Sequence, residues 1–314
     1  MMSAKKKNIS GVSEDVSASI KKDLSSKVID TSRLFYDRKL AISISESEDL
    51  EYLGFSIEHL QDAMVEFARH SLIQGAQLIY GGDLRKDGFT LILSDLSYQY
   101  RDKNEYKKEY VFNYSSYPIY LNFKPTDELE LKKNRVKLVK VAPPKNIKKI
   151  SESYFPPVTL EQKTEWADSL TKMRIEMNES SDARIFLGGR CSGYSGSMPG
   201  LLEEALISIK SNKPTFLIGA YGGVTAEIIK AIQGKDFERL SEVYQKKNDD
   251  YAKFFDHYKK VNYTELVNSL KHFGIKSLSK NNGLTEDENM ILFETKNISE
   301  MIFYVMKGLK KALK

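Results

Sequence analysis

The sequence predicts an α/β fold: a Rossmann-like, three-layer arrangement with a mostly parallel sheet, followed by a helical C-terminal part. Three observations support this prediction. Short β-prone runs alternate with helical patterns from residue 40 onward, several of these runs end in glycines, and residues 236–314 have a mostly helical pattern. Strands and helices that alternate with short connections are typical of a parallel sheet with helices on both faces.

The first strand and helix repeats lie before residue 101. The runs LAISIS (40–45) and AQLIYGG (76–82) predict two strands. Apolar residues recur at helical spacing in 57–72, and 89–100 has the pattern of a second helix. These four segments form the first β-α-β-α unit.

The middle of the chain is harder to assign. YPIYLNF (117–123) and VKLVKVA (136–142) are strand-like and are separated by a charged loop. Half-buried strands commonly contain such aromatic and β-branched residues. Two further strands are therefore expected here.

The second half repeats the pattern of the first. Helices are predicted at 159–177, 199–211 and 224–232, and strands at 183–189 and 214–223. A proline at the start of the second helix, Pro199, suits the first positions of a helix, where its missing N–H costs nothing. Each strand in this half leads into a glycine-containing turn.

One folded unit is expected, because no linker rich in Pro, Gly or Ser interrupts the chain. It covers residues 39–314, and 236–314 form its helical extension. Residues 1–38 are rich in Ser, Lys and Asp with scattered apolar positions, which predicts a flexible or docking tail.

Composition excludes several classes of protein. The 314 residues are 41% hydrophobic and hold a single cysteine, Cys191, so an intrachain disulfide framework is excluded and a reducing cytosol is favoured. No apolar run is long enough for a membrane span or a secretory signal, so we expect a cytoplasmic protein without membrane contact. The net charge of +5 is concentrated in residues 1–39, with nine Lys/Arg against five Asp/Glu, which makes nucleic-acid binding unlikely for the nearly neutral remainder.

Glycines gather where three predicted strands end, in LIYGGDLR, IFLGGRCSGYSGSMPG and LIGAYGG. In an open parallel sheet the carboxyl ends of the strands share one edge, and ligands bind there. Glycine lets backbone N–H groups approach a phosphate, and a helix N-terminus adds partial positive charge. The three turns together predict a site for a phosphate-bearing ligand.

Charged residues in these turns suggest roles. Arg190 could pair with a phosphate through two hydrogen bonds, and Asp83 with Arg85 flank the earlier turn. Glu203 and Glu204, early in the helix after Pro199, could hold ribose hydroxyls or act as a general acid or base at a glycosidic carbon. Interaction of Glu203 with the helix dipole is an equally good explanation for that residue.

Common catalytic and cofactor motifs are missing. The chain has neither GxxxxGK[ST] nor GxGxxG, which disfavours a P-loop NTPase and a dehydrogenase. The four histidines are dispersed without HExxH, so no metal site and no bound cofactor are expected. Ser195 lacks a nucleophile motif, and Cys191 is more simply a small residue of the glycine loop than a nucleophile.

Five segments carry a resemblance to a known family. They are SISESED (43–49), YGGDLRKDGFT (80–90), MRIEM (173–177), DARIFLGGRCSGYSGSMPGLLEEAL (182–206) and NGLTEDEN (282–289). This set resembles the SLOG superfamily, named after the DNA-processing Smf/DprA proteins and the LOG phosphoribohydrolases. The resemblance runs from about residue 39 to the C-terminus.

The resemblance implies a Rossmann-like sheet that binds nucleotides or their derivatives. Some members are enzymes that cleave the N-glycosidic bond of nucleoside monophosphates, and their signature loop is similar to PGGxGTxxE. Others are sensors of a cyclic ADP-ribose-type signal made from NAD, as in Thoeris-type antiphage systems. Here Pro199–Glu204 lacks the second glycine and the Gly-Thr pair, which favours the sensors.

The glycine turns and the resemblance together give a set of expected ligand-binding residues: Ser45, Gly81, Gly82, Asp83, Arg85, Gly188, Gly189, Arg190, Gly196, Gly200, Glu204, Gly222 and Gly223.

Three hypotheses of function follow. The first is a sensor of a nucleotide or NAD-derived ligand in antiviral or nucleotide signalling, expected to form a homo-oligomer and to act on an effector protein. The second is a stand-alone hydrolase of an N-glycosidic bond, with Glu203 or Glu204 as acid or base and Arg190 on the phosphate. The third is an interaction scaffold that uses the helical C-terminus.

Overall fold

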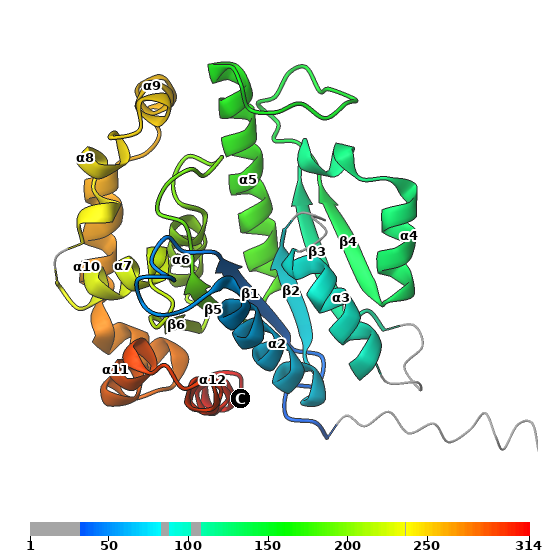
Figure 1. Ribbon diagram of the computed structural model, residues 1–314, viewed down its shortest axis with the longest axis vertical. Helices are drawn as coiled ribbons and strands as arrows, with labels where there is room; N and C mark the ends of the chain where they lie inside the picture. The colour runs from blue at the N-terminus through cyan, green and yellow to red at the C-terminus, as the bar shows by residue number, and fades with distance from the viewer. Residues whose placement is uncertain (1–31, 83–87, 102–107, 236) are drawn as a thin grey trace, which may run out of the picture.

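The computed structural model describes residues 32–82, 88–101, 108–235 and 237–314. Within them, six strands form one sheet in which all neighbours run parallel, in the order β4-β3-β2-β1-β5-β6 (Figure 1). The strands are β1 (Lys39–Ser45), β2 (Gln77–Gly81), β3 (Val111–Ser116), β4 (Val136–Val141), β5 (Ala183–Gly188) and β6 (Thr215–Ile218).

Helices cover both faces of the sheet and extend beyond β6. The α-helices are α2 (Ile57–Ile73), α3 (Phe89–Tyr100), α4 (Pro125–Lys133), α5 (Leu160–Ser180), α6 (Gly200–Lys210), α7 (Gly223–Ile232), α8 (Glu242–Gln245), α9 (Asp249–Tyr258), α10 (Tyr263–Asn282), α11 (Glu286–Glu294) and α12 (Ile298–Ala312). Two short 3-10 helices are η1 (Ile119–Asn122) and η2 (Glu238–Leu240).

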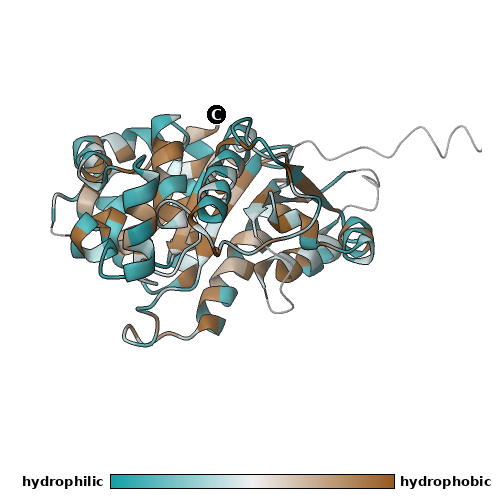
Figure 2. Cartoon of the chain, turned by 90° about the horizontal axis from the view of Figure 1, so that it is seen from above, coloured by the Kyte–Doolittle hydropathy of each residue, from teal (hydrophilic) through white to brown (hydrophobic). Residues whose placement is uncertain are grey.

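Side-chain alternation along the strands divides the core into two layers. On β1, Leu40, Ile42 and Ile44 join the core with α2, α3, α11 and α12, whereas Ala41 joins α5 on the opposite face. Phe186 of β5 packs with α6 and α7 on that same opposite face. Figure 2 shows hydrophobic residues along the strands and the inner sides of the helices. The three-layer α/β class and the helical C-terminal part are therefore confirmed.

One predicted strand is wrong. Residues 117–123 hold the 3-10 helix η1, and the third strand comes earlier, at Val111–Ser116. All six residues of β3 are buried, including Asn113, so it shows no alternation of apolar and polar residues. Pro118 has no N–H to donate to a neighbouring strand, so the ladder cannot continue through it.

The folded part begins before the first strand. Phe35 is 1% exposed, and its backbone N–H donates to the Gln74 carbonyl at 2.9 Å. Residues 1–31 of the expected tail lie outside the described residues. Among the described helices, none combines the length and the apolar character that crossing a bilayer requires.

The order of the strands fixes where loops meet. The chain moves outward from β1 through β2, β3 and β4, then returns to place β5 on the other side of β1. Ser45 and Gly188 pair at the carboxyl ends of β1 and β5, so the switch in direction lies at this pair. Ligands of open α/β sheets bind outside the carboxyl ends at such a switch point.

The docking of α12 can be tested at Gly308. A Cβ atom there would lie 2.7 Å from the Asn282 carbonyl and would also overlap the Phe216 ring of β6. We expect Gly308→Ala to lower the free energy of unfolding by about 1–3 kcal/mol through overpacking, although the same change inside a free helix stabilises it by about 0.5–1 kcal/mol. Urea unfolding measures the difference, with Lys310→Ala on the exposed side as control. A more stable Gly308→Ala would contradict this packing.

Candidate functional site

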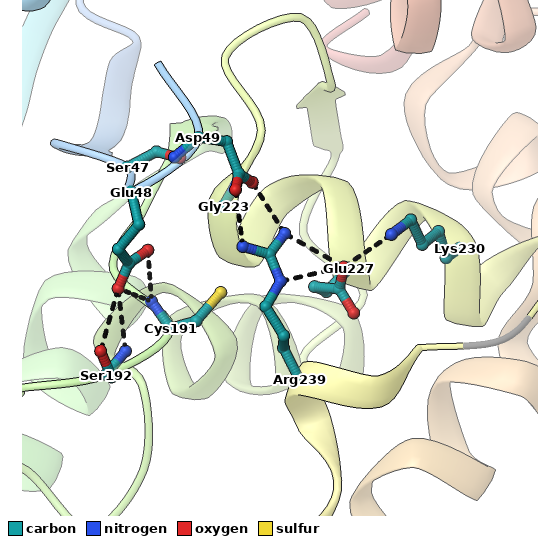
Figure 3. Close-up of polar contacts among 9 residues, drawn as sticks. All are labelled: Ser47, Glu48, Asp49, Cys191, Ser192, Gly223, Glu227, Lys230 and Arg239. Carbon is teal, nitrogen blue, oxygen red and sulfur yellow. Dashed lines mark hydrogen bonds and ion pairs between the residues drawn. The ribbon is translucent and has the colours of Figure 1, made fainter. Parts of the chain in front are cut away.

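The loops after β1 and β5 are bonded to each other at the switch point. The Glu48 carboxylate accepts the backbone N–H groups of Cys191 and Ser192, at 3.0 and 3.1 Å (Figure 3). The N–H of Gly189 donates to the Ser45 carbonyl at 2.9 Å. Amides of the glycine loop are therefore occupied by groups of the protein itself.

The start of α7 is occupied in the same way. Asp49 Oδ2 accepts the Gly223 N–H at 2.7 Å, and Arg239 donates to both Asp49 carboxylate oxygens at 2.8 and 2.7 Å. Arg239 also reaches Glu227, which pairs with Lys230 (Figure 3). Burial acts to raise the pKa of Asp49, but the hydrogen bonds from Arg239 and Gly223 outweigh it and hold that pKa below its usual range. At this end of the sheet, Asp49, Arg239, Glu227 and Lys230 therefore form a network of ion pairs that holds the start of α7.

Cys191 is buried between these loops. Burial raises the pKa of its thiol to about 12, despite the opposing charge of Arg239. A thiol is nucleophilic only as the thiolate. The geometry agrees with the expectation that Cys191 is a small packing residue.

A cleft of about 290 Å³ lies beside the switch point, over the carboxyl ends of β1, β2 and β3, and is bounded by α5 and α6. We call it the sheet-edge cleft. The expected residues that line it are Ser45, Gly81, Gly82, Arg190, Gly200 and Glu204. Of these, Arg190 is half exposed and pairs with Glu46 at 2.8 Å.

The other expected residues are not in this lining. The described ones that lie elsewhere are Gly188, Gly189, Gly196, Gly222 and Gly223. The turn after β6 belongs to an edge strand, on the far side of β5 from the cleft. Asp83 and Arg85 lie outside the described residues. Three glycine turns were expected to meet at one cleft, but only two of them line it, those after β2 and β5.

Two buried ion pairs lie beneath the cleft, and Arg174 and Glu204 of these pairs line it. Arg184 of β5 is fully buried and donates from Nη1 to Glu204 Oε2 at 2.6 Å and to Ser43 Oγ at 3.0 Å. Arg174 of α5 pairs with Glu203, and its Nε lies 3.6 Å from Glu204 Oε1. Burial lowers the pKa of Arg184, although Glu204 opposes this effect. Two arginines and two glutamates balance in charge, as buried ions require.

The two candidate acid/base residues therefore differ in position. Glu203 accepts a hydrogen bond from Thr171 and pairs with Arg174, and it is not in the cleft lining. Glu204 does line the cleft, but its Oε2 already accepts hydrogen bonds from Ser43 and Arg184. Only Glu204 could contact a ligand there.

Sequence reasoning missed several polar groups of the cleft, among them Arg174, Ser115 and Ser116. Arg174 lies in the MRIEM segment, between Met173 and Met177, which both pack under the sheet. A Cβ on Gly200 would lie 2.7 Å from Arg174 Nη2, so glycine there lets the guanidinium rest on the first turn of α6. A lone arginine on the apolar face of a helix was the available signal. The serines end a strand that was itself misplaced.

These three residues carry unsatisfied polar atoms. Arg174 Nε, Ser115 Oγ and Ser116 Oγ are buried and have no hydrogen-bond partner among the described residues. Buried polar groups are normally hydrogen-bonded, so each exception calls for an explanation.

In the described parts of the chain, no group of three or more His, Cys, Asp or Glu side chains could hold a metal ion.

The fold and the cleft define a Rossmann-like α/β protein with a polar cavity at the carboxyl edge of its sheet. Residues 34–292 match the family model described as SLOG cluster2. The chain belongs to the SLOG superfamily, whose domain indicates binding of a nucleotide-related ligand or a role similar to glycosidic hydrolases. No curated protein matches the sequence.

The Asp49 network gives a pH-dependent prediction. Because the folded-state pKa is lowered, the stabilisation is complete above the unfolded value near 4 and is lost as the pH falls through the lower folded value. We expect Asp49→Asn to reduce the free energy of unfolding by about 1–2 kcal/mol at pH 7, since a charged hydrogen-bonded group is lost from a partly exposed site.

Urea unfolding of Asp49→Asn and the unchanged protein at pH 7, 4.5 and 3.5 measures this difference, which should shrink at the lowest pH. Glu46→Gln, in an exposed pair, is the control and should change stability little at any of these pH values. A difference in the free energy of unfolding that stays constant from pH 7 to pH 3.5 would show that folding does not lower the pKa of Asp49.

A second prediction concerns the buried pair beneath the cleft. Glu204→Gln leaves the fully buried Arg184 without its anionic partner. We expect this variant to lose about 3–5 kcal/mol of stability, the usual cost of an uncompensated buried charge. Urea unfolding checks it, again with Glu46→Gln as control. Unchanged stability would mean that Glu204 is not the counter-ion of Arg184.

Proposed function

We propose that the sheet-edge cleft binds the sugar-phosphate part of a nucleotide or of an NAD-derived ligand of the ADP-ribose type, and that the protein senses this ligand. One observation carries the proposal. Arg174, Ser115 and Ser116 line one cleft, and Arg174 Nε and the two serine Oγ atoms are buried without a hydrogen-bond partner among the described residues. A ligand with several acceptor and hydroxyl oxygens would satisfy them.

The chemistry of the lining fits such a ligand. A guanidinium binds phosphate oxygens in two parallel hydrogen bonds, and Arg190 stands half exposed with only a surface ion pair to displace. Serine hydroxyls both donate and accept, as recognition of ribose hydroxyls requires. The cleft also borders Gly200, the first residue of α6, and helix N-termini favour anions.

Sensing is favoured over hydrolysis by the state of Glu204. Its Oε2 accepts from Ser43 and Arg184, so its role is to neutralise a buried arginine. A general acid needs a proton to give, and a general base needs a free lone pair directed at the reacting group. As a sensor the protein would act through a homo-oligomer or an effector protein, in antiviral or nucleotide signalling.

Hydrolysis of an N-glycosidic bond is the second candidate. The observation in its favour is that Glu204 lines the cleft, where it could approach the anomeric carbon of a bound nucleotide. Arg190 would then stabilise the phosphate. Both a sensor and a hydrolase would bind the nucleotide, so only a measurement of product formation distinguishes them.

The test combines thermal unfolding with product analysis. Purified protein is incubated with AMP, NAD, ADP-ribose or cyclic ADP-ribose isomers, and both the melting temperature and the products are followed. A ligand at a hundred times its Kd stabilises the native state by about 2.7 kcal/mol. A rise in melting temperature without product supports a sensor, product formation supports the hydrolase, and no response to any of these probes contradicts both.

Arg190→Ala gives a residue-level prediction. Because Arg190 is exposed and its ion pair with Glu46 is a surface pair, we expect the variant to fold normally. It should bind the responding nucleotide at least tenfold more weakly, from the loss of one charge-assisted contact of about 1.5–3 kcal/mol. Arg69→Ala, which breaks a comparable surface pair on α2, is the matched control. Equal affinity of both variants would place the phosphate elsewhere.

A further inference from the structure

A second cavity, of about 500 Å³, lies between the loop after β5 and the helices α8 and α9. We call it the aromatic cavity, because its walls include the rings of Tyr194, Tyr244, Tyr251 and Phe254. Figure 1 shows α8 and α9 on the side of the molecule away from β4. The helix α5 also borders the aromatic cavity, through Lys163.

Tyr194 belongs to both cavities. Its side chain lines the sheet-edge cleft as well as the aromatic cavity, so the two spaces share one wall. The Tyr194 hydroxyl donates to Gln245 Oε1 at 2.6 Å and lies 3.0 Å from the Tyr263 hydroxyl. Its ring meets the Tyr251 ring edge-on, with 5.2 Å between centroids. These contacts fix the shared wall in place.

The sheet-edge cleft is small for a ligand of the ADP-ribose type. Ligand cavities usually measure about 300–1,000 Å³ and enclose most of the ligand. The cleft, at about 290 Å³, lies at the lower limit of this range, and the aromatic cavity adds about 500 Å³ next to it. A ligand that extends past Tyr194 would fill both.

The walls of the aromatic cavity suit a planar heterocycle. Aromatic side chains stack on nucleobases whatever the base, and each stack contributes to the affinity.

The edge of the aromatic cavity is charged and open. Lys163 pairs there with the exposed Asp250 at 2.5 Å, and Lys247 pairs with the exposed Glu238 at 3.0 Å. At Gly193 a Cβ would meet nothing within 4 Å, so the cavity is open along the loop.

We propose that the aromatic cavity is a base-binding subsite. It would stack the nucleobase of a nucleoside diphosphate sugar whose sugar-phosphate part occupies the sheet-edge cleft, with Tyr194 between the two parts. This inference rests on the proposed function and adds to it a ligand of the size of a nucleoside diphosphate sugar and a second place of contact.

Ser195 offers a way to fill the aromatic cavity without disturbing the cleft. It lines only the aromatic cavity, is exposed on the loop, and makes no hydrogen bond within the described part of the chain. Ser195→Trp places a ring in the cavity, and Ser195→Ala is the matched control. The probes are ADP-ribose, which carries a base, and ribose 5-phosphate, which does not.

Calorimetric titration of both variants and the unchanged protein gives the dissociation constants. We expect Ser195→Trp to weaken ADP-ribose binding at least tenfold and ribose 5-phosphate binding less than twofold, whereas Ser195→Ala changes neither. Thermal unfolding of Ser195→Trp is the control that checks whether this variant folds.

The remaining outcomes overturn the inference. Undiminished ADP-ribose binding by Ser195→Trp, or an equal loss for both probes, would mean that the base does not lie in the aromatic cavity, while the proposed function would stand. Binding of neither probe by the unchanged protein would also overturn this inference, whereas the proposed function would fail only if AMP, NAD and the cyclic ADP-ribose isomers gave no response either.

Discussion

The acidic loop after β1 joins three turns at the carboxyl edge of the sheet. Glu48 holds the amides of Cys191 and Ser192, and Asp49 holds the first amide of α7 (Figure 3). The two carboxylates satisfy N–H groups that would otherwise be free for an anion. They tie together the turns after β1, β5 and β6, and so they close the switch point itself. The open space lies to one side, toward β2 and β3.

The polar character of that open space comes from charges buried beneath it. Arg184 neutralises Glu204, and Arg174 lies against the backbone of Gly200. Loss of a partner from either buried pair would leave a charge in a medium of low dielectric, which is strongly destabilising. Arg174 Nε lies 3.6 Å from Glu204 Oε1 and has no hydrogen-bond partner among the described residues. Arg174 and Glu204 therefore belong both to the buried ion pairs and to the lining of the cleft.

Most of the fold could be predicted from local patterns, and the errors have physical causes. The helix at 89–100 is found where expected, because its apolar spacing is regular. The strand Val111–Ser116 was missed because a strand buried on both faces shows no alternation, and its Asn113 and serines resemble a loop. In the site, Ser45, Gly81, Gly82, Arg190, Gly200 and Glu204 were expected and do line the cleft. Arg174 was not, because its place on the apolar face of a helix is a weak signal that does not tell which cavity the arginine reaches.

The sequence by itself determined the α/β class, the positions of the glycine turns and membership of the SLOG superfamily, since all three depend on residues that are neighbours in the chain. Only the tertiary structure decided which turns share a cleft. The turn after β6 is separated from the cleft by β5. The acidic residues after β1 accept hydrogen bonds from the backbone N–H groups that a ligand was expected to use. The order of strands and the pairing of charges join segments more than a hundred residues apart, and no local pattern contains that information.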